Sequence, residues 1–267
     1  MLKNISIGQY YPGDSVVHRL DPRTKLTLSF AFIVVLFIVK GFLAYLWLAA
    51  LVLVAAQVAG VPLKVMLRGL RPLKFIIALT FFLHLFTTRG GAVLWEWQFL
   101  RVESNGLVQG TFLAFRLMLL VVATSLLTLT TSPIALTDGL ERILSPGAKV
   151  GLPAHELAMM MTIALRFIPT LIDEADKIMR AQLARGADFE SGGLVKRAKS
   201  LLPLLVPLFV SAFRRADELA MAMEARAYRG GEHRTRLKVL KYSRNDFWAY
   251  CLAGLAFATA YFLGRWG

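Results

Sequence analysis

The stretch LVQGTFLAFRLMLLVVATSLLTLTT, residues 107–131, decides the fold class. It carries one charged residue, Arg116, and as a helix it is long enough to cross a bilayer, which takes about 20 apolar residues. The whole chain shares this character, because 57% of its 267 residues are hydrophobic and its mean hydropathy is +0.58. A soluble domain of this size is rarely so apolar. The sequence therefore predicts an all-α, polytopic membrane protein.

Four further apolar runs have the length of a membrane span or come close to it. They are residues 26–39, 42–59, 73–88 and 247–263. Two more apolar stretches, 157–172 and 201–213, contain residues that we expect to interrupt them, namely Arg166 and Pro169 in the first and Pro203 and Pro207 in the second. We interpret neither as a clean span, so the prediction is about five transmembrane helices, with seven as the upper bound.

The distribution of basic residues predicts the orientation, since Lys and Arg accumulate in short cytoplasmic connections. With a cytoplasmic N-terminus, segments 1–25, 60–74 and 132–245 lie inside and hold 4, 4 and 18 of the 31 Lys and Arg residues. The sequence thus divides into an N-terminal membrane region with four spans (1–131), a cytoplasmic or interfacial region (132–245) and a C-terminal transmembrane helix (246–267).

The net charge of +14 could indicate nucleic acid, anionic lipid or an acidic protein as a partner. In the cytoplasmic region the charges are mixed, as where Asp173, Glu174 and Asp176 stand beside Lys177 and Arg180. This mixing is typical of helices that form i,i+4 pairs and contact membrane lipids. A nucleic-acid site would also need base-stacking aromatic residues on the basic face, so we expect no nucleic-acid partner.

Sequence motifs for several enzymatic chemistries are missing. The chain has no G-x-x-x-x-G-K-[ST] phosphate loop, and His155-Glu156 is followed by Met159 where a zinc-protease helix needs its second His. The predicted spans hold no Asp or Glu, which disfavours a proton-coupled carrier. We expect a structural role for Arg116 and a packing or interhelical hydrogen-bonding role for His84.

An alternative is a membrane-embedded enzyme that acts on a lipid or prenyl phosphate at the cytoplasmic interface. Such an enzyme would need paired acids to hold Mg²⁺. The best candidates are Asp173, Glu174 and Asp176, which are better explained as surface charge on a helix.

The cytoplasmic region contains an internal repeat that ends in an Ala-Arg pair. The copies read Ala175-Asp176, Ala181, Ala184-Arg185-Gly186 and Ala216-Asp217, Ala222, Ala225-Arg226-Ala227. Arg before Gly is also an ordinary helix end, because the cation complements the helix dipole and Gly adopts the left-handed cap. Two copies in the same phase favour a second interpretation, in which a small-residue stripe admits a partner and the guanidinium binds its carboxylate. We therefore predict a pair of docking helices.

With these residues in view, the sequence resembles the transmembrane T-component of energy-coupling factor (ECF) transporters, the EcfT/CbiQ family. Besides the two Ala-Arg ends, the resemblance rests on four stretches that together cover most of the chain. They are GQYYPGDS (8–15), HRLDPRTKL (18–26), TDGLER (137–142) and ALRFIP (164–169).

The resemblance implies a non-enzymatic coupling scaffold of an ABC-type importer for a vitamin or a metal ion in a prokaryotic plasma membrane. In the family, two ABC-type ATPase subunits dock at the Ala-Arg-Gly helix ends, and a separate S-component binds the substrate. ATP and Mg²⁺ belong to the ATPases, so no cofactor is expected in this chain. Carried over, the docking residues are Ala184, Arg185, Gly186, Ala225, Arg226 and Ala227.

One of these positions departs from the family pattern, because Ala227 stands where the motif has Gly. Since Gly230-Gly231 follows, we expect the second helix to run one turn further, with Arg226 keeping its role. The prolines at 169, 203 and 207 are expected to bend the helices that carry the motif.

The N-terminal motif Asp21-Pro22-Arg23 has a structural explanation. Asp is a good N-cap and Pro is favoured at the first helical position, so the motif should begin the first span. Arg23 and Lys25 are then expected to anchor that span to the anionic leaflet.

Overall fold

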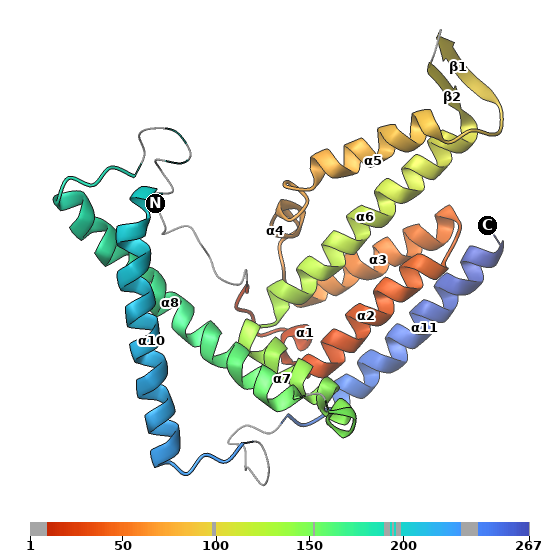
Figure 1. Cartoon of the computed structure of the whole chain (residues 1–267). Helices are drawn as coiled ribbons and strands as arrows, with labels where there is room; N and C mark the ends of the chain where they lie inside the picture. The colour runs from red at the N-terminus through yellow and green to blue at the C-terminus, as the bar shows by residue number, and fades with distance from the viewer. Residues whose placement is uncertain are drawn as a thin grey trace. The chain divides into compact units, whose positions relative to one another are not determined.

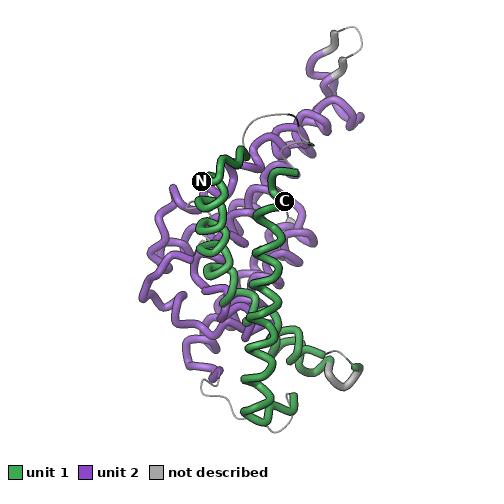
Figure 2. Tube along the Cα trace, turned by 60° about the vertical axis from the view of Figure 1, so that its left-hand side comes forward, with its two compact units in different colours: residues 1–7, 141–238 green, residues 8–140, 239–267 purple. Residues whose placement is uncertain are grey.

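The computed structural model describes residues 10–97, 100–151, 153–189, 193, 195, 199–230 and 240–266. It divides into two compact units, shown in different colours in Figure 2. Unit 1 comprises residues 1–7 and 141–238, and unit 2 comprises residues 8–140 and 239–267.

Unit 2 is a bundle of long apolar helices (Figure 1). Its helices are α1 (Val16–Arg19), α2 (Pro22–Ile38), α3 (Phe42–Ala59), α4 (Leu63–Arg68), α5 (Lys74–Thr87), α6 (Ser104–Thr130) and α11 (Arg244–Trp266), together with the first part of α7 (Pro133–Leu144). Helix α11 returns from the end of the sequence to pack against α2 and α3, and α6 packs against α2, α3 and α5. The first three helices of the chain and its last helix therefore share one bundle.

Small residues set the distance between helices in this bundle. Gly106 and Gly110 of α6 face α5 so closely that a Cβ on Gly106 would lie 2.9 Å from the Leu85 carbonyl oxygen, and one on Gly110 would lie 3.0 Å from that of Phe81. This G-x-x-x-G spacing permits the backbone contact typical of membrane helices. A larger residue at either position would separate the two helices.

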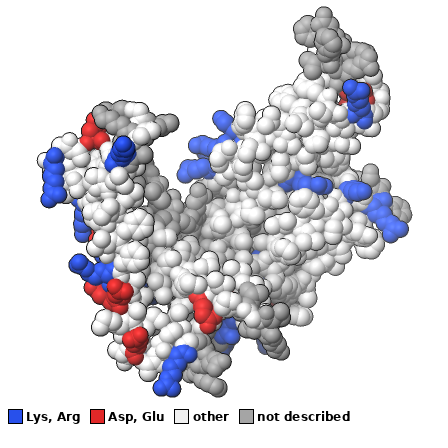
Figure 3. All heavy atoms as spheres, in the orientation of Figure 1, with Lys and Arg blue, Asp and Glu red and all other residues white. Residues whose placement is uncertain are grey.

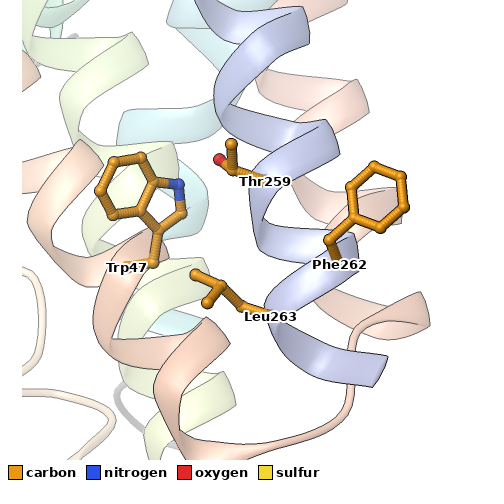
Figure 4. A pocket seen from close by; sticks show the side chains of 4 residues that line it. All are labelled: Trp47, Thr259, Phe262 and Leu263. Atoms are coloured by element: carbon orange, nitrogen blue, oxygen red, sulfur yellow. The ribbon is translucent and has the colours of Figure 1, made fainter. Parts of the chain in front are cut away.

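The core of unit 2 lies along one face of α3. Ala44, Leu48 and Ala56 have no exposed surface, and Tyr45 between them is 1% exposed. Trp47, on another face of α3, donates its indole N–H to the carbonyl oxygen of Ala256 in α11 at 3.0 Å. Figure 4 shows the apolar pocket beside this contact, where Trp47 stands opposite Thr259 and Leu263 of α11, with Phe262 completing the lining.

A β-hairpin joins α5 to α6. Strands β1 (Val93–Trp97) and β2 (Leu100–Glu103) pair in antiparallel fashion after Gly90 and Gly91, whose φ angles of +124° and +89° favour glycine. The sequence-based description had no strand here, so the hairpin is an addition to the all-α prediction.

Unit 1 consists of the end of α7, the 3₁₀ helix η2 (Ser145–Val150) and two long helices, α8 (Ala154–Ala184) and α10 (Leu202–Ala225). Both long helices contain an internal proline, Pro169 in α8 and Pro207 in α10, and Pro203 lies in the first turn of α10. The prediction that prolines interrupt these stretches is therefore wrong. Pro203 sits where its missing N–H has no helical partner, and the chain remains helical through the other two.

The five predicted spans correspond to α2, α3, α5, α6 and α11, which confirms a polytopic α-helical membrane protein. By length and apolar composition, four described helices could cross a membrane: α3, α6, α8 and α11. Helices α2 and α5 have 17 and 14 residues and fall short of that length, whereas α8 was not counted as a span from the sequence. Five is therefore an approximate number.

The surface of unit 2 is apolar enough to face the acyl chains of a membrane. Large apolar side chains are exposed, among them Phe30 (70%), Phe75 (71%) and Leu255 (69%). In Figure 3 the visible face of unit 2 is mostly uncharged, with scattered Lys and Arg. In water such a continuous apolar surface would promote aggregation, so a lipid environment is required.

Candidate functional site

The two Ala-Arg ends lie at the C-termini of the two long helices of unit 1. Helix α8 ends at Ala184 with Arg185 as its C-cap, and α10 ends at Ala225 with Arg226 as its C-cap. All six predicted docking residues are exposed: Ala184, Arg185, Gly186, Ala225, Arg226 and Ala227. The structure thus presents both Arg residues at accessible helix tips.

Helix α8 closes with a Schellman motif. The Gly186 N–H donates to the Leu183 carbonyl oxygen at 3.0 Å, and the Ala187 N–H donates to that of Gln182 at 3.0 Å. Gly186 has φ +84°, the left-handed conformation that this motif needs and that glycine adopts without steric cost.

Helix α10 closes in the same way, although it lacks the glycine. The Ala227 N–H donates to the Glu224 carbonyl oxygen at 2.8 Å, and the Tyr228 N–H donates to that of Met223 at 3.0 Å. Ala227 takes φ +54°, a left-handed conformation that costs an L-residue about 1 kcal/mol. The prediction that this helix runs one turn further is therefore wrong, because the cap forms at the family position despite the alanine. Gly231 lies outside the described residues.

Within unit 1, α8 and α10 cross (Figure 1). An ion pair marks the crossing, since the Arg215 guanidinium donates to the Glu174 carboxylate at 3.1 Å. From Glu174 to Arg185 and from Arg215 to Arg226 the sequence advances by the same eleven positions. At 1.5 Å per residue, each tip lies about 16 Å along its own helix from the crossing.

In unit 2, the N-terminal motif begins α2 as predicted. Asp21 is the N-cap, its carboxylate accepts the Arg23 N–H at 2.9 Å, and Pro22 occupies the first turn. The Arg23 guanidinium binds the same carboxylate with two hydrogen bonds of 2.9 and 3.0 Å. Gly8 and Gln9, which also carried the family resemblance, lie outside the described residues.

Arg23 and Lys25 do not reach outward to lipid, so their predicted anchoring role is wrong. Lys25 is 7% exposed, and its ammonium donates to the carbonyl oxygens of His18 at 3.0 Å and Thr130 at 2.9 Å. These carbonyls belong to the last turns of α1 and α6, where helices leave acceptors unpaired. Lys25 therefore caps two helices at once, and its charge complements both helix dipoles.

A second group, missed in the sequence, connects this motif to α11. The Asp246 carboxylate accepts the N–H of Ser243 at 2.7 Å and the N–H of Asp21 at 2.8 Å. In return, the Asp246 N–H donates to the Ser243 hydroxyl at 3.3 Å, which completes a capping box at the start of α11. The spacing Ser-x-x-Asp before an apolar run was the available signal for the box, but nothing in it pointed to Asp21.

Arg23 also holds the chain that leads into α11. Its guanidinium lies 4.0 Å above the Tyr242 ring and donates to the Leu240 carbonyl oxygen at 3.2 Å. We call the contacts among Asp21, Arg23, Tyr242 and Asp246 the clasp. The clasp joins the beginning of α2 to the beginning of α11.

The acidic residues proposed for an enzymatic metal site do not gather into one. Across the described part of the chain, no three His, Cys, Asp or Glu side chains lie close enough to share a metal ion. Of the three candidates, Glu174 serves the helix crossing. His155, from the incomplete zinc motif, contacts the Glu141 carboxylate at 2.9 Å.

Comparisons with known proteins identify the family of this chain. The family CbiQ, described as "Cobalt transport protein", matches residues 13–237. Proteins named "Energy-coupling factor transporter transmembrane protein EcfT" match nearly the full chain. The one from Thermosediminibacter oceani is 59% identical over 254 residues, with 95% of this chain and 96% of its own length covered. The relative from Clostridium kluyveri is 55% identical over 271 residues with both chains fully covered, and that from Bacillus subtilis is 49% identical over 246 residues, covering 92% and 93%.

The chain belongs to the CbiQ/EcfT family. The resemblance noted in the sequence is thus confirmed, and the chain is a transmembrane component of an energy-coupling factor transporter located in a membrane. The relatives carry the names of transporter components, which supports a non-enzymatic role and leaves the lipid-phosphate enzyme without support. Membership of the EcfT family also implies a complex with other transporter components.

Proposed function

We propose that this chain couples ATP hydrolysis in two ABC-type ATPase subunits to substrate uptake by a separate S-component. Arg185 and Arg226 dock one ATPase each, and the small residues beside them allow close approach of the ATPase surface. ATP and Mg²⁺ are bound by the ATPases, so this chain itself holds no cofactor.

The proposal rests on the similar ends of helices α8 and α10. Arg185 and Arg226 are exposed C-caps of helices that end in the same Schellman geometry. Each lies eleven residues beyond the ion pair at the crossing of α8 and α10. Two equivalent sites at equal distances from one crossing are what two copies of a similar partner require, and an exposed guanidinium provides a bidentate contact to a carboxylate on each.

An apolar stripe on α10 supports the proposed contact with the S-component. Its members recur at helical spacing and are each more than half exposed: Leu202 (54%), Val206 (60%), Phe209 (60%) and Phe213 (69%). A stripe of this kind needs an apolar cover. We assign it to the S-component, so that movement of the helix tips reaches the substrate-binding subunit through α10 itself.

The proposed orientation places the N-terminus and the helix tips in the cytoplasm of a prokaryotic cell. The basic residues concentrated in segments 1–25, 60–74 and 132–245 support it. A vitamin or a metal ion is the proposed substrate class, and the family description, which names cobalt transport, supports the metal ion.

The test is charge reversal at both tips in the assembled transporter. The chain is co-expressed with its ATPase subunits and S-component and purified by an affinity tag on the chain. Arg185→Glu with Arg226→Glu should reduce the ATPases recovered per chain about tenfold or more, because two charge-assisted contacts become repulsive. Membrane insertion should remain normal.

The matched control reverses two exposed arginines on the same helices away from the tips, Arg180→Glu with Arg214→Glu. This pair carries the same change in net charge and should leave ATPase recovery near the wild-type level. Wild-type recovery and ATP-driven uptake in the Arg185/Arg226 variant would refute docking at the tips.

A further inference from the structure

A cavity of about 380 Å³ lies in unit 2 where the turn between α2 and α3 meets α3, α5 and α6. Its polar lining comes from all four: Lys40 of the turn, Tyr45 of α3, His84 of α5, and Gln109 and Arg116 of α6. Within the described residues no carboxylate lines it. His84 and Arg116, for which the sequence predicted packing or structural roles, thus share one basic cavity.

Arg116 is held in a fixed position within this cavity. Its Nε–H donates to the Tyr45 hydroxyl oxygen at 2.8 Å, and the Tyr45 hydroxyl in turn donates to the Leu36 carbonyl oxygen at 3.0 Å. The guanidinium also lies 5.1 Å from the centre of the Phe37 ring and 5.9 Å from that of Tyr45. These contacts occupy Nε and leave the two Nη groups to donate to something else.

The guanidinium lacks a compensating anion in the described part of the chain. No Asp or Glu described by the structure lies within 4.0 Å of it. An arginine on the membrane-facing part of a helix requires either a partner or access to the interface. The neighbouring Lys40 adds a second positive charge, so the cavity as a whole is suited to an anion.

The position of the cavity along the bundle indicates where this anion comes from. The residues Lys40 and Gly41 form the turn between two apolar helices, and such a turn lies at a membrane interface. Since Arg116 lines the same cavity, it lies at the level of this turn and not at the bilayer centre.

We propose that this cavity binds the phosphate group of an anionic phospholipid from the leaflet that surrounds the α2–α3 turn. The Nη groups of Arg116 donate to two phosphate oxygens, and Lys40 neutralises the remaining charge. His84 and Gln109 supply further donors at the wall of the cavity. The role of Tyr45 is to position the guanidinium.

Apolar side chains beside the cavity favour a lipid over a soluble anion. Phe37, against the guanidinium, is 56% exposed, and Phe42, which packs edge-on against Phe112 in the cavity lining, is 51% exposed. In a membrane these rings contact acyl chains. A free phosphate ion would gain nothing from them, whereas a phospholipid contacts both the basic lining and the exposed rings.

The experiment measures lipid binding to the purified full-length chain by native mass spectrometry and by the thermal shift in detergent. The probes are dioleoylphosphatidylglycerol, dioleoylglycerol, which has the same acyl chains without the phosphate, and inorganic phosphate. We expect the phosphatidylglycerol to bind and stabilise the wild type, and the other two to have little effect. Arg116→Gln should weaken phosphatidylglycerol binding about tenfold, the value for losing one or two charge-assisted hydrogen bonds.

Two further variants keep the test decisive if Arg116→Gln folds poorly. Lys40→Gln, at an exposed turn, should also weaken phosphatidylglycerol binding, and Arg89→Gln, an exposed basic residue in the loop after α5, should leave it unchanged. Equal binding of the diacylglycerol, or displacement of the phospholipid by inorganic phosphate, would overturn the proposal. Wild-type binding of the phospholipid by Arg116→Gln would also overturn it, because the guanidinium would then not be the ligand of the phosphate.

Discussion

Glu174 and Arg215 bind each other at 3.1 Å from equivalent positions of the internal repeat, each directly before an Ala-Asp pair. The two residues are 41 positions apart, and so are Arg185 and Arg226. Helices α8 and α10 therefore meet at the same point of their repeats. A substitution at this contact should alter the distance between Arg185 and Arg226 without changing either residue.

Breaking the Glu174–Arg215 pair should impair transport more than stability. Glu174→Gln or Arg215→Gln alone should cost no more than about 1 kcal/mol of unfolding free energy, because the side chains are 25% and 36% exposed and solvent weakens the pair. ATP-driven uptake should fall several-fold, since the tips lose their fixed separation. Uptake in membrane vesicles and thermal unfolding in detergent measure the two effects.

Exchange of the two charges provides the control for this pair. Glu174→Arg combined with Arg215→Glu restores an ion pair in the reverse order and should recover most of the uptake. An exchange variant as impaired as either single variant would show that the pairing is not what matters at the crossing.

The equivalent cap positions of α8 and α10, Gly186 and Ala227, predict opposite changes in stability when glycine and alanine are exchanged. Gly186→Ala should destabilise the last turn of α8 by about 1 kcal/mol, because the new Cβ is strained at φ +84°. Ala227→Gly should stabilise the last turn of α10 by a similar amount by removing the strain at φ +54°. Amide hydrogen exchange in the two last turns is the measurement, and changes of the same sign would contradict the shared cap geometry.

Removal of the Lys25 ammonium should destabilise unit 2. In Lys25→Met, the carbonyl oxygens of His18 and Thr130 lose their donor in a buried site, at a cost of about 2 kcal/mol or more. Thermal unfolding of the purified chain measures this loss. Lys64→Met, at an exposed position of α4, removes the same charge and should change little. Equal effects of the two substitutions would mean that charge alone, and not the two caps, is responsible.

Asp246→Asn should weaken the clasp by about 1–3 kcal/mol, since an amide cannot accept on both sides as the carboxylate does. The amide nitrogen must face either the Asp21 N–H or the Ser243 N–H, which are both donors. The matched control is Asp14→Asn, because the Asp14 side chain is 92% exposed and pairs with an exposed Arg19. Unfolding temperatures of the two variants should therefore differ, and identical values would contradict the clasp.

Apolar run length and helix-capping preferences, which depend on neighbouring residues, predicted the positions of most membrane helices. Apolar length located α2, α3, α5, α6 and α11, and the capping preferences located Asp21 and Pro22 at the start of α2. The phase of the repeat predicted that Arg185 ends its helix, whereas the extra turn expected after Arg226 is absent. Each of these features depends on a few neighbouring residues, so a single sequence contains the necessary information.

Features that depend on distant neighbours were missed or misjudged. The inward turn of Lys25 depends on Thr130, 105 positions away, and the link from Asp246 to Asp21 spans 225 positions. The left-handed Ala227 was misjudged because residue preference favoured a longer helix, while the hydrogen bonds to Met223 and Glu224 favour closure at the family position. Tertiary contacts determine the first two features, and local hydrogen bonds that close the helix determine the third.

The clasp also fixes the end of the segment that leads from α10 to α11. Leu240 follows Ala225 by only fifteen residues, and the Arg23 guanidinium holds both its carbonyl oxygen and the Tyr242 ring. We expect a force that reaches Leu240 along the chain to act first on these contacts of Arg23, and only then on the packing of α11 against α2 and α3. Arg23 thereby shields the packing of α11 from movements of the chain that precedes it.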